Sequence, residues 1–142
     1  MRNGKVVVYI SIAGDLLHIG HRRILLSGRR FGDILIAGVI TDDGIKRYKR
    51  EAIIPFEERV EMIRDYVDEV ISQDGQDPTD NLKADYSIDI LVHGDDWPED
   101  YPAFEYMRRM GKKVVRLPYY KEQSTTKIIA RILELASKKG KK

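Results

Sequence analysis

Cysteine is absent from the 142-residue chain, and its absence excludes several kinds of site. Without cysteine there is no disulfide scaffold, no thiolate nucleophile and no cysteine-bound zinc. An excess of charge of one sign is missing too, because 25 lysines and arginines face 23 aspartates and glutamates, for a net charge of +2. That balance argues against a surface that coats nucleic acid, so we expect no nucleic-acid partner.

Long apolar runs are also missing. A typical run, Ile34 to Ile40, is far shorter than the ~20 residues that a transmembrane helix needs. The basic start before Val6 superficially resembles a signal peptide, but the apolar stretch that follows is short and β-branched, as in a buried strand. We therefore expect a cytoplasmic protein without a membrane partner.

What is present is a globular composition, 42% hydrophobic and 34% charged, at the length of one domain. Apolar patterns predict five strands, which are Lys5 to Ser11, Asp33 to Ile40, Glu69 to Ser72, Asp89 to His93 and Lys113 to Leu117. Helices are predicted between and after them, at His18 to Phe31, after Pro55, at Thr79 to Tyr86, at Pro102 to Met110 and at Thr125 to Lys139.

This alternation predicts an α/β fold, a Rossmann-like five-stranded parallel sheet with helices on both faces. We expect a single domain over residues 1–142, with a basic tail at 137–142 and a polar, basic connection from Thr41 to Ile54. The last helix is expected to turn inward its apolar residues Ile128, Ile129, Ile132, Leu133 and Leu135. The first helix is expected to show solvent its arginines Arg22, Arg23, Arg29 and Arg30.

Ligands of parallel sheets sit at the carboxyl ends of the strands, and a first polar cluster follows the first strand. His18 and His21 flank Gly20 at the predicted start of a helix, where free backbone N–H groups and the helix dipole favour an anion. Imidazoles beside such a site can donate hydrogen bonds to phosphate oxygens. Two other interpretations are that both histidines cap the turn, or that they bind a metal, for which no third ligand lies nearby.

Two more clusters follow the fourth and fifth strands. The turn from His93 to Trp97 holds two acids that suit Mg²⁺ or the polar groups of a ligand, or that cap the turn. Ser124, Thr125 and Thr126 open the last helix, either as an ordinary N-cap or as a second anion site aimed at the same crevice.

A basic run from Lys46 to Arg50 lies in the connection after the second strand. Such a run is usually a solvated face. Its position beside the crevice also suits a loop that closes over phosphate.

Together these clusters resemble the signatures of the HxGH nucleotidyltransferase superfamily. The stretch from Asp15 to His21 contains the HxGH signature, and Gly94 to Trp97 and Ser124 to Thr126 resemble the other two signatures of its cytidylyltransferase branch. Glycerol-3-phosphate cytidylyltransferases share these signatures. Thr41 to Asp43, Tyr48 to Arg50 and the pair Phe56 and Arg59 resemble more closely the cytidylyltransferase modules of phosphonate biosynthesis.

The resemblance implies transfer of CMP from CTP to a small phosphate or phosphonate, with release of pyrophosphate. It implies catalytic roles for His18, His21 and Lys49, and acceptor or triphosphate contacts for Arg50, Arg59 and Lys121. The nucleotide would lie on Ala13, Gly14, Gly20, His93, Asp95, Trp97, Ser124, Thr125 and Thr126. It also implies Mg²⁺ carried by the triphosphate, and a homodimer.

Two departures from the family pattern keep alternatives open. Ala13 stands where a Ser or Thr usually touches the triphosphate, and the usual Arg before the Ser/Thr cluster is missing, so that Lys121 or Arg116 would have to replace it. The altered segment helps to read the base, which leaves an ATP-dependent adenylyltransferase as an alternative. A nucleotide-binding module without catalysis is the second alternative.

Overall fold

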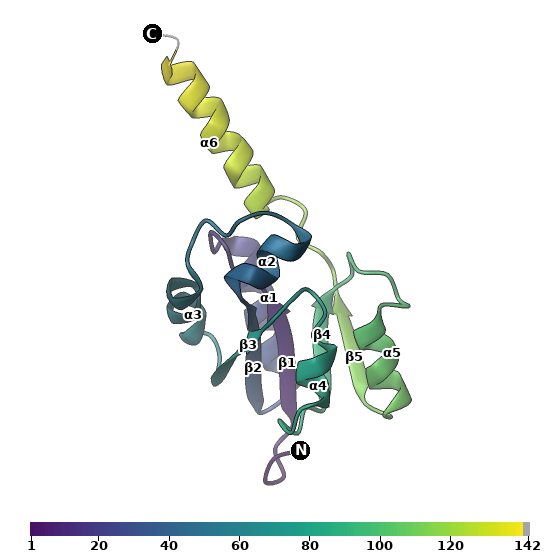
Figure 1. Ribbon diagram of the computed structural model, residues 1–142. Helices are drawn as coiled ribbons and strands as arrows, with labels where there is room; N and C mark the ends of the chain where they lie inside the picture. The colour runs from purple at the N-terminus through teal and green to yellow at the C-terminus, as the bar shows by residue number, and fades with distance from the viewer. Residues whose placement is uncertain (141–142) are drawn as a thin grey trace.

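The structure is a computed structural model that describes residues 1–140, and its centre is a parallel five-stranded sheet. The order is β3-β2-β1-β4-β5, so the chain works outward from β1 on one side and then crosses to the other side (Figure 1). The strands are β1 Val7–Ile12, β2 Ile34–Ile40, β3 Glu69–Gln73, β4 Ile90–Gly94 and β5 Lys113–Leu117. All four neighbouring pairs are parallel, which confirms the predicted Rossmann-like sheet.

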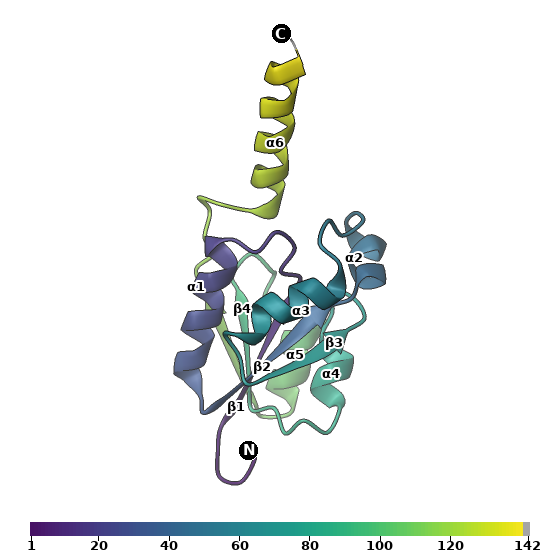
Figure 2. The same cartoon turned by 90° about the vertical axis from the view of Figure 1, so that its left-hand side faces the viewer.

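Helices cover the two faces of this sheet, as predicted (Figure 2). The helices are α1 Ile19–Gly28, with the 3₁₀ turn η1 Arg29–Phe31, α2 Asp42–Tyr48, α3 Phe56–Arg64, α4 Thr79–Lys83, α5 Pro102–Arg109 and α6 Thr125–Gly140. Side chains alternate along β1, so Val8 and Ile10 pack with α1 and α3, whereas Val7 and Tyr9 pack with α4 and α5. Two apolar cores result, one on each face.

The segment from Thr41 to Ile54 is more ordered than predicted, because it contains α2. Thr41 caps this helix by accepting a hydrogen bond from the Gly44 N–H at 3.0 Å, and Asp42 lies in the first turn. Ile45 is fully buried. Because α2 buries only one large apolar side chain, the sequence shows no apolar periodicity there, and the helix was not predicted.

The prediction that α6 packs inward is wrong. The helix starts above the carboxyl ends of the strands and extends away from the sheet (Figures 1 and 2). Ile128 and Ile129 are half-buried, but Ile132 is 54% exposed and Leu133 is 65% exposed. The apolar stripe was read correctly, but the stripe alone does not say what covers it. Residues 137–140 of the expected tail belong to α6, and 141–142 lie outside the described residues.

Candidate active site

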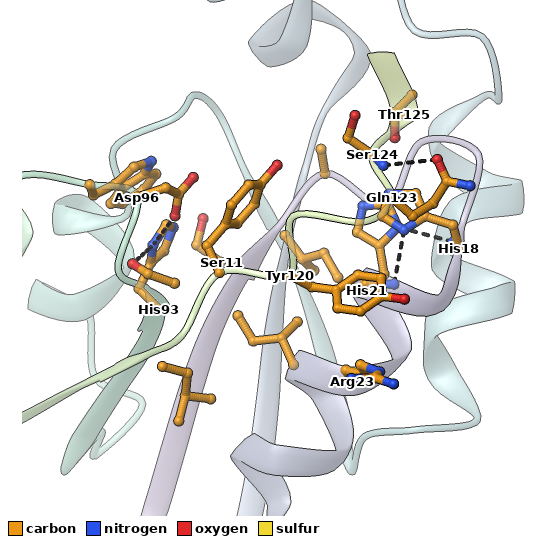
Figure 3. A pocket seen from close by; sticks show the side chains of 18 of the residues that line it. Ser11, His18, His21, Arg23, His93, Asp96, Tyr120, Gln123, Ser124 and Thr125 are labelled. Atoms are coloured by element: carbon orange, nitrogen blue, oxygen red, sulfur yellow. Dashed lines mark hydrogen bonds and ion pairs between the residues drawn. The ribbon is translucent and has the colours of Figure 1, made fainter. Parts of the chain in front are cut away.

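A cavity of about 800 Å³ lies at the carboxyl ends of β1, β4 and β5, next to the point where the strand order reverses. This is where a parallel sheet is expected to bind its ligand. Figure 3 shows that its wall combines the start of α1, the end of β4 and the segment that leads from β5 into α6. Three predicted clusters therefore meet in one place, and their lining members are His18, His21, His93, Trp97, Ser124, Thr125 and Thr126.

The two histidines of the first cluster form a reciprocal cap on α1. His18 is the N-cap, and its Nδ1 accepts a hydrogen bond from the Gly20 N–H at 3.0 Å. The Nδ1 of His21 accepts one from the His18 N–H at 3.1 Å. A Cβ at Gly20 would lie 2.8 Å from His18 Cε1, so glycine is required between them. The capping interpretation is thus correct for Nδ1 of both rings.

The same hydrogen bonds determine what the rings offer to a ligand. A neutral imidazole that accepts through Nδ1 carries its proton on Nε2, so each ring retains one N–H donor. The two rings lie close together, with centroids 3.9 Å apart, and both line the cavity. The cluster therefore caps a helix and presents a pair of donors at that helix's N-terminus.

Burial keeps both histidines neutral. It lowers the pKa of His21 to about 3, with the charges of His18 and Lys49 acting in the same direction. The pKa of His18 is also lowered by burial and by Lys49. Since a bound polyphosphate is an anion, its charge would oppose these shifts. Neutral rings remain good hydrogen-bond donors, so the site needs no proton uptake to bind a phosphate.

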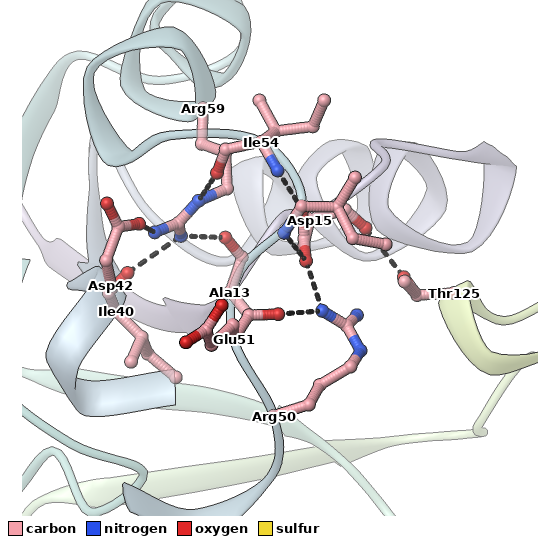
Figure 4. A network of polar contacts seen from close by, with 10 residues as sticks. Ala13, Asp15, Ile40, Asp42, Arg50, Glu51, Ile54, Arg59 and Thr125 are labelled. Carbon is pink, nitrogen blue, oxygen red and sulfur yellow. Dashed lines mark hydrogen bonds and ion pairs between the residues drawn. The ribbon is translucent and has the colours of Figure 1, made fainter. Parts of the chain in front are cut away.

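Asp15, which opens the signature, holds the turn in place. Its carboxylate accepts hydrogen bonds from the N–H groups of Ile53 and Ile54 and pairs with Arg50 at 2.6 Å (Figure 4). Burial raises the pKa of Asp15, but the hydrogen bonds from Ile53, Arg50 and Ile54 outweigh that effect and leave it below the usual range. Its carbonyl oxygen accepts a 2.7 Å hydrogen bond from Thr125 Oγ1, which ties the start of α6 to this turn.

Arg59 joins the ends of β1 and β2 behind the cavity. Its side chain is fully buried and donates to the carbonyl oxygens of Ala13, Ile40 and Ile54 at 2.6, 2.7 and 2.9 Å (Figure 4). It also pairs with Asp42 of α2 at 2.7 Å. Acceptors within the protein therefore occupy the guanidinium donors, and Arg59 positions the wall of the cavity.

The turn after β4 is built around stacked rings. His93 and Trp97 lie with centroids 3.4 Å apart and planes 25° apart, and both line the cavity. Burial lowers the pKa of His93, the hydrogen bond to the Gly94 carbonyl opposing it. The Asp95 carboxylate accepts from the Tyr119 N–H at 2.9 Å and lies outside the lining, whereas Asp96 is in it.

The predicted site residues divide into two groups. The structure brings to the cavity Ala13, His18, Gly20, His21, Lys49, His93, Trp97, Ser124, Thr125 and Thr126. It places outside the described lining Gly14, Arg50, Arg59, Asp95 and Lys121. Arg116, considered as a replacement for the missing arginine, donates to the carbonyl oxygens of Asp95 and Trp97 and pairs with Glu99.

Several residues that line the cavity were not predicted as site residues from the sequence. They include Arg23, Arg30, Tyr120, Glu122 and Gln123. Arg23 and Arg30 are exposed, as expected, but they also line the cavity. The only sequence signal for the second property of Arg23 is its position three residues after Gly20, one helical turn along. Since helical spacing does not show which side of α1 meets the segment after β5, that signal was not sufficient.

The lining offers little to hold a metal by protein ligands alone. Among residues 1–140 no group of three or more histidine, cysteine, aspartate or glutamate side chains has the arrangement of a metal site. The carboxylates in the described lining are Asp96 and Glu122. Mg²⁺ commonly takes one or two carboxylates and completes its shell with water and substrate phosphates, so the lining fits a metal that arrives with a polyphosphate.

No helix in the described part of the chain has the length and apolar character to cross a membrane.

Comparison with known proteins finds one family over most of the chain. The family model described as cytidylyltransferase-like matches residues 15–131. FAD synthase of Pyrococcus abyssi is 36% identical, and the match covers 94% of this chain and 96% of that protein. Glycerol-3-phosphate cytidylyltransferase of Bacillus subtilis is 35% identical, with 87% and 93% covered.

Other relatives are much longer than this chain. The bifunctional protein HldE of Syntrophotalea carbinolica is 34% identical over 94% of this chain, which spans only 28% of HldE. Among solved structures, the lipopolysaccharide core biosynthesis protein of Thermoplasma volcanium superposes with a TM-score of 0.72 at 24% identity, covering 83% of this chain and all of that one. The structural likeness supports the fold described above.

Proposed function

Because this chain belongs to the cytidylyltransferase-like family, we propose that it transfers CMP from CTP to a small phosphate or phosphonate acceptor. In this reaction an anionic oxygen of the acceptor attacks the α-phosphorus of CTP. The new oxygen–phosphorus bond forms as the bond to the bridging oxygen breaks, and pyrophosphate leaves with that electron pair. The nucleophile is already an anion, so the site needs positioning and charge stabilisation, not a strong base.

The observation that carries the proposal is the pair of Nε2–H donors at the start of α1. His18 and His21 present them into the cavity, next to the helix N-terminus and to Lys49. Donors fixed in place before the reaction stabilise charge that develops on the α-phosphoryl oxygens at little reorganisation cost. The rings are held by their own backbone hydrogen bonds, so their orientation does not depend on the substrate.

Other lining residues suit the remaining parts of CTP. Thr126 and the N-terminus of α6 are proposed to bind the β- and γ-phosphates. Ser124 already caps α6 by accepting a hydrogen bond from the Lys127 N–H at 3.1 Å. His93 and Trp97 line the part of the cavity that is proposed to hold the nucleoside. Bound Mg²⁺ would neutralise part of the triphosphate charge.

Three basic residues that were predicted to contact the substrates lie outside the cavity lining, and each is proposed to act in a different way. Arg50 is held at Asp15, where a rearrangement of the loop at 50–54 would free it for the acceptor. Arg59 holds the Ala13 carbonyl, and thereby the backbone that faces the triphosphate. Lys121 lies outside the lining and keeps a role only if the segment after β5 moves inward.

A second candidate is adenylyl transfer from ATP. It is favoured by the FAD synthase relative, whose match covers 96% of that protein. The cytidylyltransferase relative and the turn from Gly94 to Trp97 favour CTP. A third candidate is nucleotide binding without catalysis, motivated by Ala13, whose side chain has no hydroxyl for the triphosphate.

Pyrophosphate release separates these candidates. The full chain would be mixed with Mg²⁺, with one of the four ribonucleoside triphosphates, and with a panel of small phosphates and phosphonates. Release with CTP and one acceptor is the expected result and identifies both substrates. Release with ATP alone would overturn the choice of CTP, and CTP binding without release across the panel would support the non-catalytic module.

A further inference from the structure

Arg23 of α1 reaches the cavity from a side where no functional residue was expected. Its guanidinium lies over the ring of Tyr120, 4.5 Å from the ring centroid, and both residues line the cavity. Figure 3 shows this pair beside His21, at the opposite end of the cavity from His93 and Asp96. Stacking on an aromatic face restricts a long side chain and leaves the edge of the guanidinium free to donate.

Tyr120 also rests on the histidine turn. A Cβ at Gly20 would lie 3.5 Å from Tyr120 Cδ1, so the ring lies directly against this turn. The ring of Tyr120 therefore lies near both Gly20 and Arg23, which follows one helical turn later. This stacking restrains the guanidinium beside the helix N-terminus that the two histidines cap.

The charge of Arg23 is available for a ligand. No carboxylate lies within ion-pair distance of it among residues 1–140. The two residues considered as replacements for the family's missing arginine are engaged or remote, since Arg116 binds the turn after β4 and Lys121 is outside the lining. Glu122, which also lines the cavity, makes no ion pair with Arg23 or with any other basic residue of the described chain.

We propose that Arg23, braced by Tyr120, binds the pyrophosphate portion of the nucleoside triphosphate and takes the place of the missing arginine. Figure 3 places His93 and Asp96 across the cavity from the two histidines, with Arg23 on one side of the histidines and Ser124, at the start of α6, on the other. With the nucleoside at His93 and the α-phosphate at the histidines, Arg23 flanks the phosphate chain and is assigned the leaving pyrophosphate. This assignment rests on the proposed nucleotidyl transfer.

Inorganic pyrophosphate is the probe, because it occupies the proposed subsite without a base and without turnover. Calorimetric titration of the full chain would compare wild type with Arg23→Ala, Tyr120→Phe and Arg22→Ala. Arg22 is the matched control, an exposed arginine on the same turn that does not line the cavity. Loss of a charge-assisted hydrogen bond predicts about 10- to 100-fold weaker binding for Arg23→Ala.

Tyr120→Phe keeps the aromatic face and should bind as wild type, whereas Tyr120→Ala should lose part of the affinity. CMP, which lacks the β- and γ-phosphates, should bind equally to wild type and Arg23→Ala. Equal loss in Arg22→Ala and Arg23→Ala would show a nonspecific charge effect and overturn the proposal, as would a wild-type chain that does not bind pyrophosphate.

This test separates the subsite from the reaction. Pyrophosphate binding that depends on Arg23, in a chain that releases no pyrophosphate from CTP or ATP with any acceptor, would sustain the subsite and reject the proposed transfer. If Arg23→Ala releases pyrophosphate from CTP with the same KM for CTP as wild type, the transfer would be sustained and the subsite rejected.

Discussion

At the scale of single residues, the two histidines owe their chemistry to backbone hydrogen bonds. Each Nδ1 accepts an N–H from its own turn, which leaves Nε2 to donate, and burial keeps the rings uncharged. Histidine suits this position because it accepts through one nitrogen and donates through the other. Lysine or arginine has no acceptor and would leave the cap unmade.

Replacing His21 by alanine should lower kcat by about 10²- to 10³-fold, because one donor to the transition state is lost. The measurement is pyrophosphate release with the nucleotide and acceptor that support wild-type turnover. The variant also loses half of the cap, so its thermal unfolding should be recorded on the same sample. Arg22→Ala is the control, and unchanged turnover in His21→Ala would contradict the assignment.

The lowered histidine pKa values predict how stability depends on pH. In the unfolded chain a histidine takes up a proton near pH 6.5, whereas His21 in the folded chain does so only near its pKa of about 3. The unfolded state therefore binds more protons in this interval, and the free energy of unfolding falls as the pH falls below about 6.5.

Urea unfolding at pH values from about 7.5 to 5 would measure this dependence. His21→Asn, which has no titratable group and can still accept the cap hydrogen bond, should show a shallower fall than wild type. Identical pH dependence in the two proteins would mean that His21 is not held neutral by the fold.

At the scale of elements, Arg59 makes one unit of four segments. From α3 it contacts the carbonyl oxygens at the ends of β1 and β2, the loop before its own helix, and Asp42 of α2. A fully buried guanidinium is stable only when its donors are paired, and these contacts use the main-chain acceptors where the strands stop. Arg59 therefore holds in place the strand ends that form the edge of the cavity.

Arg59→Met should destabilise the fold by about 3 kcal/mol or more, because similar volume remains but several buried acceptors lose their donor. The free energy of unfolding from urea titration measures this. Arg64→Met, at an exposed position of the same helix, should change stability by no more than about 0.5 kcal/mol. A similar small effect at both positions would mean that the network contributes little.

At the scale of the whole molecule, α6 stands apart from the compact body. Its charged residues Lys127, Arg131, Glu134 and Lys138 share one side, while the opposite side carries Ile132 and Leu133 in contact with solvent. A contiguous exposed apolar strip of this kind is typical of an interaction surface. Together with the homodimer that the family resemblance implies, it leads us to propose that a second copy covers this strip.

Sedimentation velocity would test this proposal. We expect twice the monomer mass for wild type, and the monomer mass for Leu133→Glu, because a buried charge opposes the contact. Lys138→Glu places a carboxylate at an exposed position on the opposite, charged side of α6 and should leave the dimer intact. A monomeric wild type would contradict the proposal.

The local pattern of the chain determined the order of strands and helices and the position of the HxGH turn. Buried parallel strands read as continuous apolar runs, and caps depend on residues a few positions apart, so both are visible in sequence. The sequence also predicted that the three polar clusters lie close together, because the carboxyl ends of parallel strands share one edge of the sheet.

Only the tertiary structure decided which polar side chains enter the cavity. Arg23 and Arg22 are neighbours of the same type, and their difference depends on where Tyr120, about a hundred residues later, comes to lie. The roles of Arg59 and Asp15 likewise depend on partners far along the chain, and the direction of α6 depends on how the segment after β5 leaves the sheet. Sequence periodicity shows which side of an element is apolar, whereas long-range contacts decide what that side meets.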